Sequence, residues 1–425
     1  MTPLPAARTT RSLARAALGG LAVVLAACSS PKPAAPTSEL VFPAPSAGLP
    51  RATAPSPPAV VAPPPLDVAL RQAVVALAGS WVEGQTPPSG TARRALVALP
   101  FIDVATGTAH TLTSHIESSV LTELRELSAS KLEVLPFAPN ALARTPWLLT
   151  GTLVRPVPGG AGDAMSLCLV MIDTRDGRIA AQATVQARAG GVAIPPAIVR
   201  DAPLWIRDAA VDMQVRACRD ARIGDKADAG FLAALPVAAR VASASEHYGA
   251  GRLAAARTEL RAALALPGGR RADVLNGLYL TEWRLKRGKE AEQVFGDLVA
   301  HGMATRRMGL LLPFKADAAE LPTGKQLTQP LTMWWKQIAQ RVPQKGGTCL
   351  DISGHASSGS ADDAGEGLSF RRAFVVRTQL IERSPNLAAA TVVNGLGTRQ
   401  RLVGSGANDA SDALDRRVEL SLKDC

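Results

Sequence analysis

The chain has 425 residues, 47% of them hydrophobic and 20% charged, and its formal net charge at pH 7 is +11. This composition is globular and excludes a chain that is disordered throughout, while the length favours two or three domains over a single core. The positive charge suits an anionic polymer or a membrane surface. No single basic tract dominates and no nucleic-acid-binding motif occurs, so we expect no nucleic-acid partner.

The N-terminus has the pattern of an export signal. Three arginines precede the apolar run 16–27, which is too short to span a bilayer as a mature helix. Cys28 follows the small residues Ala26 and Ala27, at the place where cleavage would fall. We therefore predict a signal peptide over 1–27. An ordinary secretory signal with an incidental cysteine is the alternative.

The segment Leu25–Cys28 resembles the lipobox of bacterial lipoproteins. The resemblance implies that Cys28 is acylated and becomes the new N-terminus. Ser29 stands where an aspartate would be the usual retention signal for the inner membrane in enteric bacteria, so the resemblance implies a lipid anchor in the outer membrane, facing the periplasm. Residues 28–65 contain twelve prolines, which predicts an extended tether without a core of its own.

Four more cysteines follow the predicted anchor. The periplasm is oxidising, so an even number of cysteines favours two disulfides. Of the three possible pairings, we favour Cys168–Cys218 and Cys349–Cys425, because each pair then lies within one predicted domain. No CxxC motif occurs and no histidine stands at ligand spacing from a cysteine, so we expect no metal site and no cofactor.

Residues 66–225 carry the pattern of an α/β domain. Apolar spacing and turn signals predict helices over 66–82, 110–127 and 204–218, strands over 95–101, 132–137 and 147–154, and a hairpin of 167–173 with 179–186. The segments ALVALPF (95–101), WLLTGTLV (147–154) and LVMIDTRDGRI (169–179) resemble the flagellar-associated FlgO type of lipoprotein domain, with CsgG and LpoB domains as distant relatives. That resemblance implies an assembly or activation factor and not an enzyme.

Residues 233–302 read as a helical pair. Gly251, Ala256, Leu260 and Ala263 have a spacing that resembles a tetratricopeptide repeat, in which small residues allow close helix packing. A second unit is weaker. A helical connector and a peptide-binding groove are both open interpretations of this region.

Residues 303–425 show the order strand, helix, strand, helix, strand, strand. The predicted strands are 308–314, 349–355, 390–395 and 416–422, and the predicted helices are 327–342 and 368–381. The segments SGH (353–355), LSFRRA (368–373), NGLG (394–397) and DRRVELSL (415–422) resemble the OmpA-like, or Pal/MotB-type, domain. The resemblance implies a βαβαββ fold that binds the diaminopimelate stem peptide of peptidoglycan non-covalently.

Arg372 is the main candidate for binding a stem-peptide carboxylate. With a helix starting at Leu368, Arg372 would lie in the first turn, where the helix dipole already favours an anion. The guanidinium adds a bidentate fork. A solvated helix arginine is the alternative interpretation.

The resemblance also implies a partner for the ligand's ammonium group. The family's aspartate corresponds to Ser357 here, and its asparagine corresponds to Gly365, so the ammonium half of the pocket lacks its usual side chains. Asp362 and Asp363 either substitute for them or are solvated loop acids. Arg417 corresponds to an arginine that usually lies near the pocket, although Arg416 and Arg417 can instead pair along the last strand.

No Ser–His–Asp grouping, HExxH, P-loop or GxSxG motif occurs in the sequence, so we expect no enzyme activity. The fold class that we predict is multidomain α/β and α+β. It joins an α/β domain similar to FlgO and CsgG, a short helical pair and an OmpA-like domain. The expected function is an outer-membrane lipoprotein anchored to peptidoglycan. The alternative is a periplasmic assembly or regulatory factor of an envelope machine, which holds a protein partner and has a degenerate peptidoglycan site.

Overall fold

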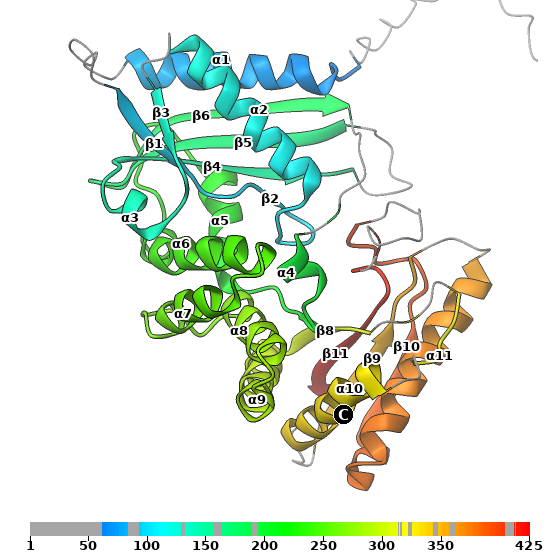
Figure 1. The fold of residues 1–425 in the computed structure, drawn as a ribbon. Helices are drawn as coiled ribbons and strands as arrows, with labels where there is room; N and C mark the ends of the chain where they lie inside the picture. The colour runs from blue at the N-terminus through cyan, green and yellow to red at the C-terminus, as the bar shows by residue number, and fades with distance from the viewer. Residues whose placement is uncertain are drawn as a thin grey trace, which may run out of the picture. The chain divides into compact units, whose positions relative to one another are not determined.

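The structure of the chain is a computed structural model (Figure 1). It describes residues 62–83, 93–128, 132–156, 164–188, 194, 196–312, 314, 317–321, 325–342, 347–357, 362–403, 412 and 414–425. The predicted signal peptide, Cys28 and the tether up to residue 61 lie outside the described residues. Residues 61–425 form one compact unit. Within the described ranges, no helix has the length and apolar character to cross a membrane.

The first sheet is mixed and contains the predicted strands of the α/β region. Its order is β3-β1-β4-β5-β6, with β2 paired to β4. Strands β1, β2 and β3 run parallel to their partners, and β4, β5 and β6 form antiparallel pairs. The bounds are β1 Arg94–Ala98, β2 Ile102–Asp103, β3 Leu132–Leu135, β4 Trp147–Val154, β5 Ala164–Asp173 and β6 Arg178–Arg188. The single strand predicted over 95–101 is divided in two around Pro100, which has no backbone N–H to donate.

Helices cover both faces of this sheet (Figure 1). On one face, α1 (Leu66–Glu83) and α2 (Thr111–Leu127) bury their apolar stripes against the strands. On the other face lie α3 (Pro139–Leu142), α5 (Ala209–Arg219) and α6 (Ala229–Gly249). A disulfide joins Cys168 on β5 to Cys218 on α5, as we favoured from the sequence. The first part of the chain is therefore a three-layer α/β/α structure.

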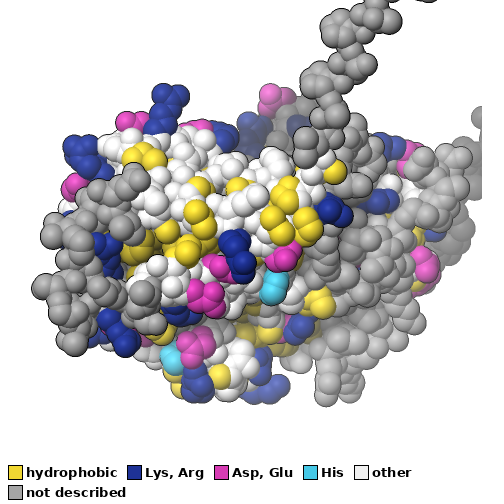
Figure 2. Space-filling view, turned by 90° about the horizontal axis from the view of Figure 1, so that it is seen from above, with side chains coloured by type: hydrophobic (Ala, Val, Ile, Leu, Met, Phe, Trp, Pro, Cys, Tyr) yellow, Lys and Arg dark blue, Asp and Glu magenta, His cyan; other side chains and the backbone are white. Residues whose placement is uncertain are grey.

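The outer surface of α1 has scattered apolar side chains. Val68 is 42% exposed and Val75 is 52% exposed. Figure 2 shows from above that such hydrophobic side chains alternate with basic and acidic ones on this face. Isolated exposed valines of this kind are ordinary on a protein surface and do not by themselves mark a binding site.

The prediction of one helix over 204–218 is wrong at its start. Leu204–Trp205 is a short strand, β7, and α5 begins only after Asp208. Strand β7 pairs antiparallel with β8 (Arg307–Leu311) of the second sheet, which buries both of its side chains. The Asp208 carboxylate does not cap α5. It accepts a hydrogen bond from the backbone N–H of Ala272, at the start of α8 (Ala272–Arg284), and lies 2.5 Å from the His301 ring.

The region 233–302 contains more helix than the single pair that we predicted. Helices α6, α7, α8 and α9 follow one another as antiparallel neighbours (Figure 1). The last three span Leu253–Leu264, Ala272–Arg284 and Gly288–Ala304. Gly251 makes the turn before α7 at φ +73°, and Ala256 and Ala263 are fully buried. The small residues thus allow close packing, while the assignment to tetratricopeptide repeats stays a prediction.

The second sheet has the predicted order of elements. It contains β8 (Arg307–Leu311), β9 (Thr348–Gly354), β10 (Thr391–Gly395) and β11 (Arg417–Asp424), with helices α10 (Lys325–Arg341) and α11 (Asp362–Ile381) between them. The strand order is β10-β9-β11-β8-β7. Strands β9 and β10 are parallel, and β11 runs antiparallel to both β9 and β8. The second favoured disulfide, Cys349–Cys425, joins the start of β9 to the end of the chain.

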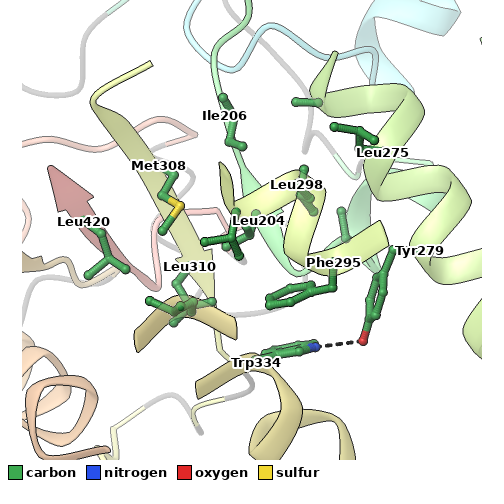
Figure 3. Close-up of a cluster of buried hydrophobic side chains, with 14 of the residues drawn as sticks. Leu204, Ile206, Leu275, Tyr279, Phe295, Leu298, Met308, Leu310, Trp334 and Leu420 are labelled. Atoms are coloured by element: carbon green, nitrogen blue, oxygen red, sulfur yellow. Dashed lines mark hydrogen bonds between the residues drawn. The ribbon is translucent and has the colours of Figure 1, made fainter. Parts of the chain in front are cut away.

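One hydrophobic core connects the helices to the second sheet (Figure 3). Phe295 of α9 stacks on Trp334 of α10, with ring centroids 5.6 Å apart. The indole N–H of Trp334 donates a hydrogen bond of 2.8 Å to the Tyr279 hydroxyl. Leu204 and Leu310 belong to the same cluster. The core therefore continues across the boundary that we placed between residues 302 and 303.

Because they share one core, we expect a mutation in that core to lower the hydrogen-exchange protection of the backbone amides in both α9 and the second sheet. We expect Leu298→Ala, at a fully buried position of α9, to cost about 2–5 kcal/mol of unfolding free energy. Hydrogen exchange should show faster exchange in β9 as well as in α9. The matched control is Leu124→Ala, because Leu124 is equally buried but belongs to the core between α2 and the first sheet. Unchanged protection of β9 in Leu298→Ala would contradict the prediction.

Candidate functional site

Three of the four segments that resemble the OmpA-like domain meet at the ends of β9 and β10. The Leu396 N–H donates to the Gly354 oxygen, and the Ala356 N–H donates to the Gly397 oxygen, both at 2.9 Å. The Gly397 N–H donates to the Ser369 hydroxyl on α11, also at 2.9 Å. Gly397 adopts φ +52°, a conformation that glycine accepts without strain. The loops after the two strands are thereby fixed to each other and to α11.

Gly354 is required by the close approach of α11 to β9. A Cβ atom at this position would stand 1.9 Å from the Ser369 carbonyl oxygen. Gly365, which corresponds to an asparagine in the resemblance, lies in the first turns of α11 and is buried, yet a Cβ there would have its nearest neighbours 4.0 Å away. The two glycines therefore have different roles, because only Gly354 is fixed by packing.

The structure corrects the position of Arg372 on its helix. Helix α11 begins at Asp362, so Arg372 lies in its third turn and not in its first, where the dipole would favour an anion. Acidic residues suit a first helical turn, which explains a start at Asp362 rather than at Leu368. The dipole argument for carboxylate binding by Arg372 is therefore wrong, and only its guanidinium remains as a candidate group.

Arg372 is fully buried in this structure. Its Nε donates to the Ala318 carbonyl oxygen at 3.0 Å, and its guanidinium carbon lies 5.2 Å from the centre of the Phe314 ring. Burial lowers the pKa of Arg372 to about 10, and repulsion from the nearby Arg416 adds to that effect. The charge of Asp317 acts in the opposite direction and raises the pKa of Arg372.

Ser357 lies beside Arg416. The Ser357 side chain is almost completely buried, and the Nη1 atom of Arg416 is 3.5 Å from its hydroxyl oxygen. Arg416 itself is half-buried. The structure thus brings together Ser357, Arg416 and Arg372, with the negatively charged Asp317 also acting on Arg372. Two guanidinium groups near one another favour an anion such as a carboxylate.

Arg417, which the resemblance places near the pocket, is fully buried. Its part in ligand binding stays a prediction. Its Nε donates to Glu419 at 2.8 Å, and its Nη atoms donate to the carbonyl oxygens of Leu414 and Gln400. Its guanidinium also lies over the Trp205 ring of β7. Arg417 therefore ties β11 to the neighbouring loops and to β7.

The structure does not describe the side chains of the two predicted substitute acids or of the predicted lipidation site. Asp362 and Asp363 are the first residues of α11, but their side chains lie outside the described part of the structure. Cys28 lies outside it as well. The role of the two aspartates as substitute partners for an ammonium group stays a prediction.

Sequence reasoning missed Arg416 and Phe314 as members of the site. We interpreted Arg416 as a structural partner of Arg417. The period of the last strand does not distinguish the two arginines, because β11 begins at Arg417 and Arg416 precedes it. The contact of Phe314 with Arg372 had no signal in the sequence, because 58 positions separate the two residues (372 − 314 = 58).

Neither a protein-family model nor a curated protein sequence matches the chain. Among solved structures, the periplasmic domain of Helicobacter pylori MotB is similar over 28% of this chain and 73% of its own, with 17% identity and a TM-score of 0.23. A putative MotB-like protein from Desulfovibrio vulgaris is similar over 33% of this chain and 100% of its own (19% identity, TM-score 0.23). An outer membrane protein from Borrelia burgdorferi has 15% identity over 27% of this chain and 86% of its own (TM-score 0.19).

The contrast between the two glycines gives a stability prediction. We expect Gly354→Ala to cost about 1–3 kcal/mol, because the new Cβ atom collides with the backbone of α11. Gly365→Ala should be neutral or stabilising by up to about 1 kcal/mol, because alanine is the better helix former. Urea denaturation of both variants measures the difference, and equal effects would be contrary to the packing described here.

Arg416 and Arg417 form a matched pair for a second measurement. Removing Arg417 takes away the buried partner of Glu419 and several hydrogen bonds, so Arg417→Ala should cost about 3–5 kcal/mol. Arg416→Ala should change stability by less than about 1 kcal/mol, since Arg416 is half-buried. Chemical denaturation checks both values. If Arg416→Ala lowered the free energy of unfolding as much as Arg417→Ala, Arg416 would contribute to stability as much as Arg417, contrary to this prediction.

Proposed function

We propose that the chain is a cell-envelope lipoprotein that is anchored in the outer membrane through Cys28 and binds peptidoglycan through residues 303–425. The observation that carries the proposal is the convergence of Arg372 and Arg416 beside Ser357, next to the loops that the SGH and NGLG segments form. A stem-peptide carboxylate is the ligand group that this arrangement suits. The tether 28–65 would span the distance between membrane and cell wall.

The arginines suggest how the carboxylate binds. Arg416 is the more exposed of the two and would contact the ligand directly. Arg372 is fully buried, so it would act by raising the positive potential of the site and by holding the Phe314 and Ala318 side of the pocket. Ser357 supplies a hydroxyl where the resemblance implies a carboxylate, which weakens recognition of an ammonium group.

A second function is favoured by the burial of Arg372. A fully buried arginine and a serine in place of the aspartate are also what a degenerate peptidoglycan site would have. In that case the chain is an assembly or regulatory factor that holds a periplasmic protein partner, and the FlgO-like resemblance of residues 66–225 points to the same class. The assay below separates the two functions.

Co-sedimentation with purified sacculi tests the leading proposal. The full chain is required, because the second sheet shares its core and the strand β7 with residues before 303. We expect the wild type to sediment with sacculi and Arg416→Ala to bind about tenfold more weakly, through loss of a charge-assisted hydrogen bond. Arg372→Ala should also weaken binding, and Ser357→Asp should strengthen it by about tenfold.

The control for a general effect of charge is Arg383→Ala, which removes the same charge beyond the end of α11, where Arg383 contacts Gln379 and Glu382. Its binding should equal that of the wild type. Absence of wild-type sedimentation would overturn the peptidoglycan proposal and favour a protein partner. Equal losses in Arg383→Ala and Arg416→Ala would show that sedimentation depends on net charge and not on this site.

A further inference from the structure

A second candidate site lies against the first sheet, and Arg372, Arg416 and Ser357 are not among its lining residues. It is a cavity of about 690 Å³, bounded by α2, α5, α6 and the segment that joins β1 to β2. This volume is within the range of cavities that hold small organic ligands. Its walls are mainly apolar, with Leu99, Ile102, Leu121, Val211 and Val241 among the lining residues.

The cavity lies beside the segment 99–103, whose strand β2 pairs with β4. Other parts of the chain bind the backbone of this segment away from β4, since the Asp103 N–H donates to the Thr108 oxygen at 3.0 Å. The carboxylate of Glu117 on α2 accepts a hydrogen bond of 3.0 Å from the Phe101 N–H. Glu117 is half-buried and lines the cavity. Apolar surroundings raise its pKa to about 7, although the Phe101 hydrogen bond acts in the opposite direction.

Two polar side chains that line the cavity beside this segment have capacity to accept a further hydrogen bond. Glu117 still has acceptor capacity after its bond from Phe101, since a carboxylate has about four lone-pair sites. Gln214 on α5 also lines the cavity, and its amide N–H groups donate to the Pro100 oxygen at 3.1 Å and the Thr150 hydroxyl at 3.2 Å. The side-chain carbonyl oxygen of Gln214 can therefore accept a hydrogen bond from a ligand. A ligand with a donor group matches both side chains.

The other charged residues that line the cavity are Arg125, Asp208, Arg271 and Asp273. Arg271 and Asp273 form an ion pair with an Nη2–Oδ2 distance of 2.5 Å, and Asp208 is bound to His301 and to the start of α8. Arg125 is exposed and stands eight residues, or about two helical turns, after Glu117 on α2. Among the described lining residues, Glu117 is thus the acid without a guanidinium or imidazole partner in the observed ion pairs.

We propose that this cavity binds a small amphipathic amine, whose apolar body occupies the space between α2, α5 and α6 and whose nitrogen donates to Glu117. The apolar walls supply the affinity for the body of the ligand, and the Glu117 carboxylate selects its head group. The site is independent of the peptidoglycan proposal, because it shares no residue with the group around Arg372.

Isothermal titration calorimetry of the full chain with octylamine, octanol and octanoate tests this proposal. The three probes have the same chain and differ in the head group. At pH 8 octylamine should bind most tightly and octanoate most weakly. Glu117→Gln should weaken octylamine binding about tenfold and leave octanol within about twofold, because glutamine keeps an oxygen for the Phe101 N–H but has no charge.

The pH dependence and two further variants complete the test. Octylamine affinity should rise about tenfold between pH 6 and pH 8, as Glu117 with its pKa of about 7 loses its proton and the amine keeps its charge. Glu123→Gln removes a carboxylate from the same helix at a position that pairs with Arg71, and should bind like the wild type. Ala242→Trp fills the cavity from α6 and should abolish binding of octylamine and octanol, with circular dichroism and the melting transition verifying the fold.

Three outcomes would overturn the proposal. The first is the absence of octylamine binding to the wild type, and the second is binding that Ala242→Trp leaves unchanged. The third is a preference for octylamine that Glu117→Gln retains. The first two would exclude the cavity as a ligand site, and the third would exclude Glu117 as the group that recognises the amine.

Discussion

The packing of α8, α9 and α10 against the second sheet is the contact on which the rest of the structure depends. Phe295, Trp334 and Tyr279 form its aromatic centre, and β7 and β8 supply aliphatic side chains from the sheet. Without the second sheet, or without these helices, the apolar side chains at the contact would be exposed to water, at a cost of about 25 cal/mol for each Å² of apolar area. The helices thus serve as the layer that covers the sheet and not only as a connector between domains.

Polar contacts complement this core between the first sheet and the second. Arg155, at the end of β4, bonds the buried carboxylate of Asp103 and donates to the carbonyl oxygens of Leu402 and Val403. Burial alone would raise the pKa of Asp103, but hydrogen bonds from His110 and Arg155 lower it overall. A buried carboxylate held in this way stays ionised at neutral pH, so the ion pair of Asp103 with Arg155 persists there.

The sequence allowed most of the fold to be predicted and only part of the site. Long apolar runs identified β4, β5 and β11, and the two disulfides followed from the predicted domain in which each of the four cysteines lies. Strand β7 could not be predicted, because two residues are too few to show the alternation of apolar and polar side chains that marks a strand. Its partner strand, β8, lies about a hundred positions away in the sequence. Arg372 was identified by its residue type, while its burial depends on Phe314 and Ala318, which only tertiary packing brings near.

The position of β11 determines when the second sheet can form. This strand is the last in the chain, yet it lies between β8 and β9 near the middle of the sheet. During synthesis, β7 and the helices α6–α9 emerge long before their partner strand exists, and contacts across such separations form slowly. The core that α8 and α9 share with the second sheet is therefore complete only after β11 has been synthesised.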